Sequence, residues 1–252
     1  MEKNRNYYKE VMETVLDFGQ ELLASGAEIN RVEDTLTRLG RAFSAEKTDI
    51  FVINTSIVAT MRFEGEAFTR TRRILDYTGT NFTKIDLLNT LSRKCSEEKL
   101  SPVQFRQELE KIKKQKNSCL KICIGGFLAA GAFSLFFGGG LQDALLAAVF
   151  GVIIGLLSVY LPEICPNRML STFLSALLIG LGVAAVSKMF PIFHADKITI
   201  GDIMLLVPGK AITNAARDIL LGDTISGAMK LIESLFLTGA MAAGFLLALS
   251  LL

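Results

Sequence analysis

Residues 122–141 read ICIGGFLAAGAFSLFFGGGL, a stretch of 20 residues without a charged side chain. At about 1.5 Å per residue, a helix of this length crosses the roughly 30 Å hydrocarbon core of a bilayer. Only 13 of the 52 charged residues lie in residues 122–252. The sequence therefore predicts a cytoplasmic α+β domain over residues 1–121, followed by an α-helical transmembrane domain over residues 122–252.

The C-terminal half contains further apolar stretches, which predict five spans in all: 122–141, 144–161, 169–187, 198–209 and 226–252. The fourth is short and interrupted by Gly201, Asp202, Pro208 and Gly209. Such a segment is tolerated at membrane depth only where it faces protein or a watery cavity, so we expect it to pack inside and to mark a binding site. The alternative is a re-entrant hairpin over residues 198–223.

The positive charges near the span ends predict the orientation in the membrane. Eight Lys and Arg residues fall on the side of the N-terminal half: Lys111, Lys113, Lys114, Lys116, Lys121, Arg168, Lys210 and Arg217. The opposite side has two, Lys188 and Lys197. This asymmetry favours a multi-pass protein of the cell membrane with its N-terminal domain in the cytoplasm.

Small residues recur four apart within the predicted spans. The pairs are Gly151 with Gly155, Ala176 with Gly180, and Ala240 with Gly244. This spacing allows helix backbones to approach closely, and we interpret it as ordinary helix packing.

The N-terminal half has helix and strand patterns. Apolar residues at helical spacing predict helices over 10–24 and 27–43, whereas alternation predicts strands over 49–63, with a turn at 54–56, and over 67–75. Asn81 is suited to cap a third helix. Ser101, Pro102 and Gln104 form a capping-box pattern at the start of a fourth.

A charged cluster contains Glu28, Arg31, Glu33 and the adjacent Asp34. Paired carboxylates serve as acid/base pairs or cation ligands. However, Ser25-x-x-Glu28 is also a capping-box pattern, and we favour that interpretation, so no catalytic residue is assigned.

Two other charged features also allow two interpretations. Arg70, Arg72 and Arg73 either bind an anion or protect an edge strand, and we favour the edge strand. His194, the single histidine, either senses pH or lies in a solvated loop, and we favour the loop.

Several function classes are excluded or disfavoured by composition. The nearly balanced charge, formally +2, does not suit a nucleic-acid binder. The sequence contains no phosphate-binding loop, no GxSxG elbow and no HExxH motif. Its four cysteines lack metal-ligand spacing and are expected to be reduced. We therefore predict no cofactor and no metal.

Four segments carry a family resemblance: LLASGAEINRVEDTLTRLGRAF (22–43), IFVINTSIVATM (50–61), DLLNTLSRK (86–94) and LVPGKAITNAARDILLGDTISG (206–227). In this order they resemble the threonine/serine exporter family. The resemblance implies a cytoplasmic domain followed by five helices, and gradient-driven export of small polar metabolites. The length matches the larger subunit of a split exporter, which implies a smaller membrane subunit as partner, a setting in membrane lipid, room for a higher oligomer, and threonine, serine or succinate as substrate.

The residues after Pro208 and Gly209 suit such a substrate. Arg217 can hold a carboxylate bidentately, and Thr213 and Asn214 offer hydroxyl and amide groups. Asp218 or Asp202 is the candidate proton carrier, and Asp143 is a weaker candidate for the pathway. In the alternative interpretation, residues 209–220 form an interfacial helix on which Arg217 pairs with Asp218 or Asp223.

Three functions remain open at this point. The first is an exporter subunit that is not an enzyme. The second is a membrane-anchored enzyme acting through Glu28 and Glu33 in the cytoplasmic domain. The third is a regulatory subunit of a transporter whose pathway lies in its partner.

Overall fold

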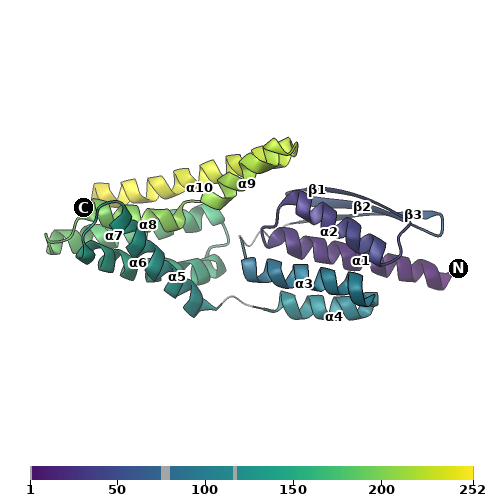
Figure 1. Cartoon of the computed structure of the whole chain (residues 1–252). Coiled ribbons are helices and arrows are strands. Elements are labelled where there is room, and N and C mark those ends of the chain that lie inside the picture. The colour runs from purple at the N-terminus through teal and green to yellow at the C-terminus, as the bar shows by residue number, and fades with distance from the viewer. Residues whose placement is uncertain (1, 75–79, 116–117, 252) are drawn as a thin grey trace. The chain divides into compact units, whose positions relative to one another are not determined.

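The computed structural model describes residues 2–74, 80–115 and 118–251 (Figure 1). The chain divides into two compact units. The first unit comprises Met1–Gln115 and Asn214–Met229, and the second comprises Lys116–Thr213 and Lys230–Leu252. The domain boundary predicted after Lys121 stays a prediction. Leu75, the predicted end of a strand, and Lys116, one of the lysines used to predict the orientation, lie outside the described residues.

An antiparallel sheet and four helices form most of the first unit. The helices are α1 (Glu2–Ala24), α2 (Ile29–Ala42), α3 (Phe82–Glu98) and α4 (Pro102–Lys113), and the strands are β1 (Lys47–Ile53), β2 (Ser56–Phe63) and β3 (Glu66–Arg73). The strand order is β1-β2-β3, and the register pairs Ile53 with Ser56 across the predicted turn. α1 and α2 pack against the sheet around the fully buried Phe18, Leu36 and Ile57. The predicted α+β pattern of this half therefore matches the described structure.

Two predicted caps in the first unit are confirmed. The side chain of Asn81 accepts a hydrogen bond from the backbone N–H of Lys84 at 2.9 Å. Ser101 and Gln104 form the capping box at the start of α4, with Pro102 in the first helical turn. Both signals are local, so the sequence alone was sufficient to find them.

The start of α1 differs from the prediction. The helix begins at Glu2, although the sequence pattern predicts a start at Glu10. The ring of Tyr8 stacks on Phe63 of β2 at 4.5 Å, with the ring planes 7° apart. This packing against the sheet stabilises a helical segment whose own sequence is polar.

The predicted capping box at Ser25-x-x-Glu28 is wrong. Gly26 has φ +82°, and the N–H groups of Gly26 and Ala27 donate to Leu23 and Leu22 at 2.9 and 3.2 Å. This is a Schellman motif, which makes Ser25 the C-cap residue that follows α1. Glu28 is the residue before α2, and its side chain makes no capping hydrogen bond.

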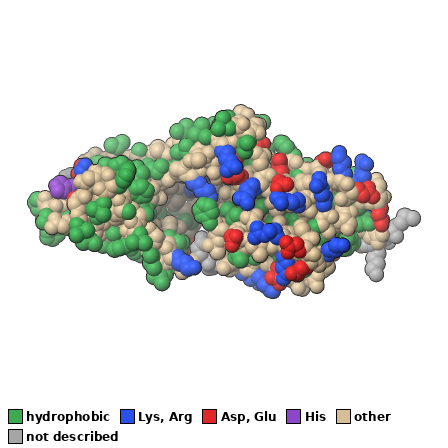
Figure 2. Space-filling view, in the orientation of Figure 1, with side chains coloured by type: hydrophobic (Ala, Val, Ile, Leu, Met, Phe, Trp, Pro, Cys, Tyr) green, Lys and Arg blue, Asp and Glu red, His purple; other side chains and the backbone are tan. Residues whose placement is uncertain are grey.

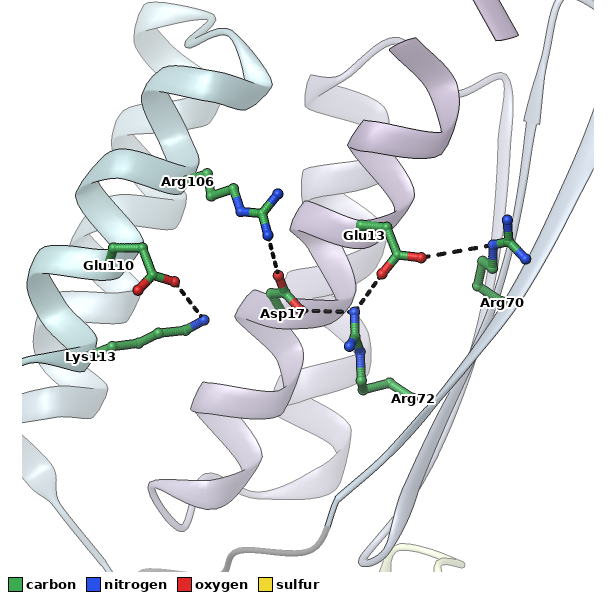
Figure 3. A network of polar contacts seen from close by, with 7 residues as sticks. All are labelled: Glu13, Asp17, Arg70, Arg72, Arg106, Glu110 and Lys113. Carbon is green, nitrogen blue, oxygen red and sulfur yellow. Dashed lines mark hydrogen bonds and ion pairs between the residues drawn. The ribbon is translucent and has the colours of Figure 1, made fainter. Parts of the chain in front are cut away.

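A network of ion pairs joins β3 and α4 to α1 (Figure 3). Arg72 contacts Glu13 at 2.5 Å and Asp17 at 2.8 Å, and Arg106 contacts Asp17 at 3.7 Å. Arg70 also lies 3.8 Å from Glu13. β3 is an edge strand, as predicted, and the guanidinium groups of Arg70 and Arg72 are engaged by α1 carboxylates, which disfavours the anion-binding interpretation.

Among the described residues, four helices are long and apolar enough to cross a membrane. They are α5 (Cys119–Phe136), α6 (Leu141–Ile164), α7 (Arg168–Met189) and α10 (Thr224–Leu251), and they match four of the predicted spans. Figure 2 shows charged side chains gathered over the first unit, whereas hydrophobic side chains dominate the surface of the long helices.

The predicted fourth span, over residues 198–209, is not confirmed. Its segment contains α8 (Ala195–Leu206), whose 12 residues extend about 18 Å and are too short to cross the hydrocarbon core. α8 packs against α5, α6 and α7, as expected for an interrupted segment inside the protein. The full five-span topology stays a prediction.

Small residues allow close contact between the long helices. A Cβ atom on Gly126 of α5 would lie 2.3 Å from the carbonyl oxygen of Gly151 on α6. Likewise, a Cβ on Gly180 of α7 would lie 2.7 Å from the Cβ of Ala248 on α10, and one on Gly244 would lie 2.6 Å from the Phe173 carbonyl. The predicted close helix packing at Gly151, Gly180 and Gly244 is confirmed.

The contact at Gly126 generates a test with a matched control one residue away. Gly126→Ala should lower the free energy of unfolding by about 1–3 kcal/mol, because the new methyl group meets a backbone oxygen that cannot move aside. Gly125→Ala should leave stability unchanged or raise it slightly, because no atom lies within 4 Å of that position. Thermal unfolding of the full chain in detergent measures both, and equal effects would contradict the packing.

Candidate functional site

The interruption between α8 and α9 (Gly209–Leu220) organises the candidate site. α8 ends at Leu206, Val207 is extended with φ −62° and ψ 127°, and α9 begins at Gly209. Pro208 cannot donate a hydrogen bond to the preceding turn and disfavours helical geometry at Val207. The predicted break at Pro208 and Gly209 is therefore confirmed.

α9 distributes the predicted substrate residues over two faces. Arg217 and Thr213 are exposed, and they lie four residues apart along the helix. Asn214 is partly buried, whereas Asp218 is 1% exposed and lies three residues after the fully buried Ala215. The Thr213 hydroxyl donates to the carbonyl of Gly209 at 3.0 Å. Arg217 and Thr213 are thus presented outward, and Asp218 belongs to the packed face.

The structure brings together two clusters that the sequence analysis treated separately. Arg217 Nη1 lies 2.8 Å from Glu28 Oε1, and both residues belong to the first unit. The Glu28 side chain is 23% exposed and that of Arg217 is 59% exposed. The guanidinium thus binds a carboxylate 189 residues away in the sequence, instead of serving only the local pairing expected with Asp218 or Asp223. Arg31, also predicted in this cluster, lies exposed on α2.

Glu33, the third predicted residue of the Glu28 cluster, has a partly buried side chain that lies near another carboxylate. Its Oε1 accepts a hydrogen bond from the backbone N–H of Val52 at 2.8 Å. Burial raises the pKa of Glu33 above its ordinary value, the bond from Val52 opposes this shift, and the nearby Asp223 carboxylate adds to it. Glu33, Asp218 and Asp223 belong to the same unit as Glu28 and Arg217.

Asn54 provides a second link between the N-terminal segment and the start of α10. Its Nδ2 donates to the carbonyl of Ser226 at 2.9 Å. Within the same unit, Gly227 packs against α9, because a Cβ there would lie 2.7 Å from the carbonyl of Ala215. The hydrogen bond from Asn54 thus links segment 214–229 to the N-terminal part of the first unit, and close backbone packing holds the segment's own two helices together.

Asp202 is the most deeply buried carboxylate of the second unit. It is 0% exposed, and neither carboxylate oxygen has a hydrogen-bond partner in the part of the chain that the structure describes. Its neighbour Gly201 lets α8 approach α5, since a Cβ at Gly201 would lie 2.7 Å from the Ala130 carbonyl. An unpartnered buried carboxylate is costly when ionised, so this environment favours the neutral acid.

Asp143 has a different setting, although it was predicted as a pathway residue. It is 2% exposed and accepts hydrogen bonds from the backbone N–H groups of Gly140 at 2.9 Å and His194 at 2.8 Å. The His194 ring nitrogen Nδ1 lies 3.0 Å from its Oδ2. Asp143 therefore caps α6 and holds the start of α8. His194 is 68% exposed, as predicted, but its contact with Asp143 was not foreseen.

The described residues contain no group of three His, Cys, Asp or Glu side chains placed to hold a metal ion. A surface groove of about 480 Å³ lies between α1 and α4, away from the predicted site residues. It is lined by Glu10, Val103, Arg106, Gln107, Glu110, Lys111 and Lys114.

These observations define a multi-pass membrane protein with ionisable side chains buried among its helices. The threonine/serine exporter family model matches residues 13–252, and the chain belongs to that family. Membership implies a membrane exporter of the threonine/serine type and points to transport instead of catalysis. Neither the curated proteins nor the solved structures contain a match to the chain.

The environment of Glu33 predicts a pH-dependent effect on stability. Because the folded-state pKa of Glu33 is raised, its protonated form stabilises the fold below about pH 4.5, and this contribution is lost as pH rises through the raised pKa. Glu33→Gln stays neutral and can still accept the bond from Val52. Its unfolding temperature should therefore exceed that of the wild type increasingly as pH rises towards neutrality.

Thermal unfolding in detergent across this pH range measures the difference, with Asp34→Asn on the same helix as the control. Asp34 is exposed and pairs with Arg38, so its neutralisation should produce no such increase. A constant destabilisation by Glu33→Gln at every pH would contradict the assignment.

Proposed function

We propose that the chain is a subunit of a gradient-driven secondary exporter for small polar metabolites that carry a carboxylate. Threonine- or serine-like amino acids and succinate-like dicarboxylates are the candidate substrates. The observation that carries the proposal is the exposed guanidinium of Arg217, which follows the helix break at Pro208 and already binds a carboxylate, that of Glu28, at 2.8 Å. A planar guanidinium matches the two oxygens of a substrate carboxylate in the same way.

Thr213 and Asn214 complete the proposed substrate site. Both lie within one helical turn of Arg217 on α9, and their hydroxyl and amide groups suit the polar remainder of a small metabolite. Pro208 and Gly209 supply the break that exposes this part of the chain. The substrate is proposed to bind here from the cytoplasmic side.

Asp202 is the proposed proton carrier. Its complete burial without a partner favours the protonated state, whereas contact with water would favour ionisation. A group whose protonation depends in this way on access to water can couple proton movement to a conformational change. Asp218, which is 1% exposed on α9, is the second candidate. Asp143 contributes to the pathway by fixing the start of α8.

The remaining proposals concern assembly and orientation. The chain is proposed to work with a smaller membrane subunit of the same family, in the lipid of the cell membrane, with room for a higher oligomer. The lysines that precede α5 or lie in its first turn, including Lys111, Lys113, Lys114 and Lys121, support a cytoplasmic N-terminal domain. No cofactor is proposed.

The first test is efflux of preloaded labelled threonine, serine and succinate from cells that express the chain alone or with its candidate small partner. Arg217→Ala should reduce efflux by about 10- to 100-fold, because a charge-assisted bond to the substrate is lost. The control, Arg38→Ala, removes an exposed arginine that pairs locally with Asp34 and should leave efflux unchanged.

If the Arg217→Ala variant exports as fast as the wild type, the proposed site is wrong. Efflux by the chain alone would remove the requirement for a partner. The label that moves fastest identifies the substrate class.

The second test concerns coupling. Asp202→Asn preserves the size of the side chain but cannot release a proton, so efflux should lose its response to an imposed pH gradient. Asp196→Asn is the matched control, because Asp196 lies on the same helix but is 67% exposed. Retention of a full pH response in the Asp202 variant would assign proton coupling to another group, with Asp218→Asn as the next variant to measure.

A further inference from the structure

The Glu28 side chain does not cap α2, although the residue stands at the N-cap position of that helix. It directly precedes α2, with φ −70° and ψ 142°, yet it makes no capping bond. Its carboxylate instead lies 2.8 Å from the guanidinium of Arg217. The residue therefore places a carboxylate where the proposed function requires the carboxylate of a substrate.

The contact between Glu28 and Arg217 is of a kind that can be exchanged. The Arg217 side chain is 59% exposed, and ion pairs that reach solvent contribute little to stability. Segment 214–229 has another attachment in the first unit, the hydrogen bond from Asn54 to the carbonyl of Ser226. Opening the ion pair would therefore leave the segment in place and free the guanidinium.

Electrostatic repulsion favours displacement of Glu28 by the substrate over binding of the substrate beside Glu28. Arg217 shares the first unit with the carboxyl groups of Glu28, Glu33, Asp218 and Asp223. The Glu28 carboxylate already offsets the single positive charge of Arg217 at 2.8 Å, so an anion that bound without displacing Glu28 would place two carboxylates against one cation. Displacement moves the Glu28 carboxylate away from the guanidinium and towards solvent, which weakens its repulsion of the substrate carboxylate.

We propose that Glu28 occupies the carboxylate position of Arg217 in the absence of substrate, and that the substrate binds by displacing it. Glu28 then competes with the substrate for Arg217 and raises the substrate concentration at which export is half-maximal. This inference rests on the proposed function, since it takes Arg217 as the substrate-binding residue. It adds a specificity rule: a ligand must carry a carboxylate that holds Arg217 better than Glu28 does.

The test is concentration-dependent transport in inside-out membrane vesicles, with the subunit combination that shows efflux and the label that moves fastest. Glu28→Gln weakens the competitor but keeps its size, so the half-saturating concentration should fall by about two- to fivefold. The maximal rate should change by less than about twofold. A higher or unchanged half-saturating concentration would overturn the proposal.

Two controls separate displacement from a general change in charge. Glu33→Gln removes a negative charge from the same unit, and Asp34→Asn removes one from the exposed face of α2. Neither should lower the half-saturating concentration as Glu28→Gln does. An equal fall in the Glu33 variant would show that local charge alone is responsible and would overturn the displacement.

A charge exchange distinguishes a competitor from a structural ion pair. Glu28→Arg combined with Arg217→Glu restores an ion pair but removes the substrate's cation, so export should stay at the level of Arg217→Ala. Recovery of export would overturn the proposal. Where the double variant does not fold, as judged by thermal unfolding, the single Glu28→Gln measurement decides alone.

The same measurements separate this inference from the proposed function. If Arg217→Ala retains full transport, or none of the three labels moves, the proposed function fails and this inference fails with it. If Arg217→Ala abolishes transport but Glu28→Gln leaves the half-saturating concentration unchanged, only the inference fails.

Discussion

The contact between the backbones of α5 and α6 at Gly126 and Gly151 is the constraint on which the second unit depends. Lipid tails are as apolar as the helices, so close packing instead of the hydrophobic effect must hold such helices together. Any side chain at Gly126 would overlap the carbonyl oxygen of Gly151. Gly201 on α8 likewise lets that helix approach α5, since a Cβ there would lie 2.7 Å from the carbonyl oxygen of Ala130. The burial of Asp202 therefore follows from small residues on three helices.

Much of the fold could be predicted because its signals are local. The uncharged stretches, the caps at Asn81 and Ser101 and the break at Pro208 depend on residues within one or two helical turns. The sequence predictions were wrong where a distant contact determines the structure, or where two local patterns fit the same residues. Tyr8 extends α1 by stacking on Phe63, which lies 55 positions later, and Gly26 ends α1 with a Schellman motif where a capping box was equally compatible with the sequence.

The sequence indicated which residues belong to the candidate site, but not which of them contact one another. Arg217 was identified because a guanidinium after a broken apolar segment suits a carboxylate, and Asp202 because it interrupts an apolar stretch. In contrast, no local pattern joins Arg217 to Glu28 across 189 residues, or Asp143 to His194 across 51. Such pairs are set by tertiary packing, which a single sequence does not record.

The difference between a tethered and a free carboxylate gives the proposed substrate an advantage over Glu28 in the contact with Arg217. Glu28 reaches Arg217 from a backbone fixed at the start of α2, which restricts the directions from which its oxygens approach. A free substrate can instead align both oxygens with the guanidinium plane and form the bidentate geometry that this group favours. Its remaining polar groups can also contact Thr213 and Asn214. The proposed substrate would thus gain bonds that Glu28 cannot form, while the displaced Glu28 carboxylate moves towards solvent.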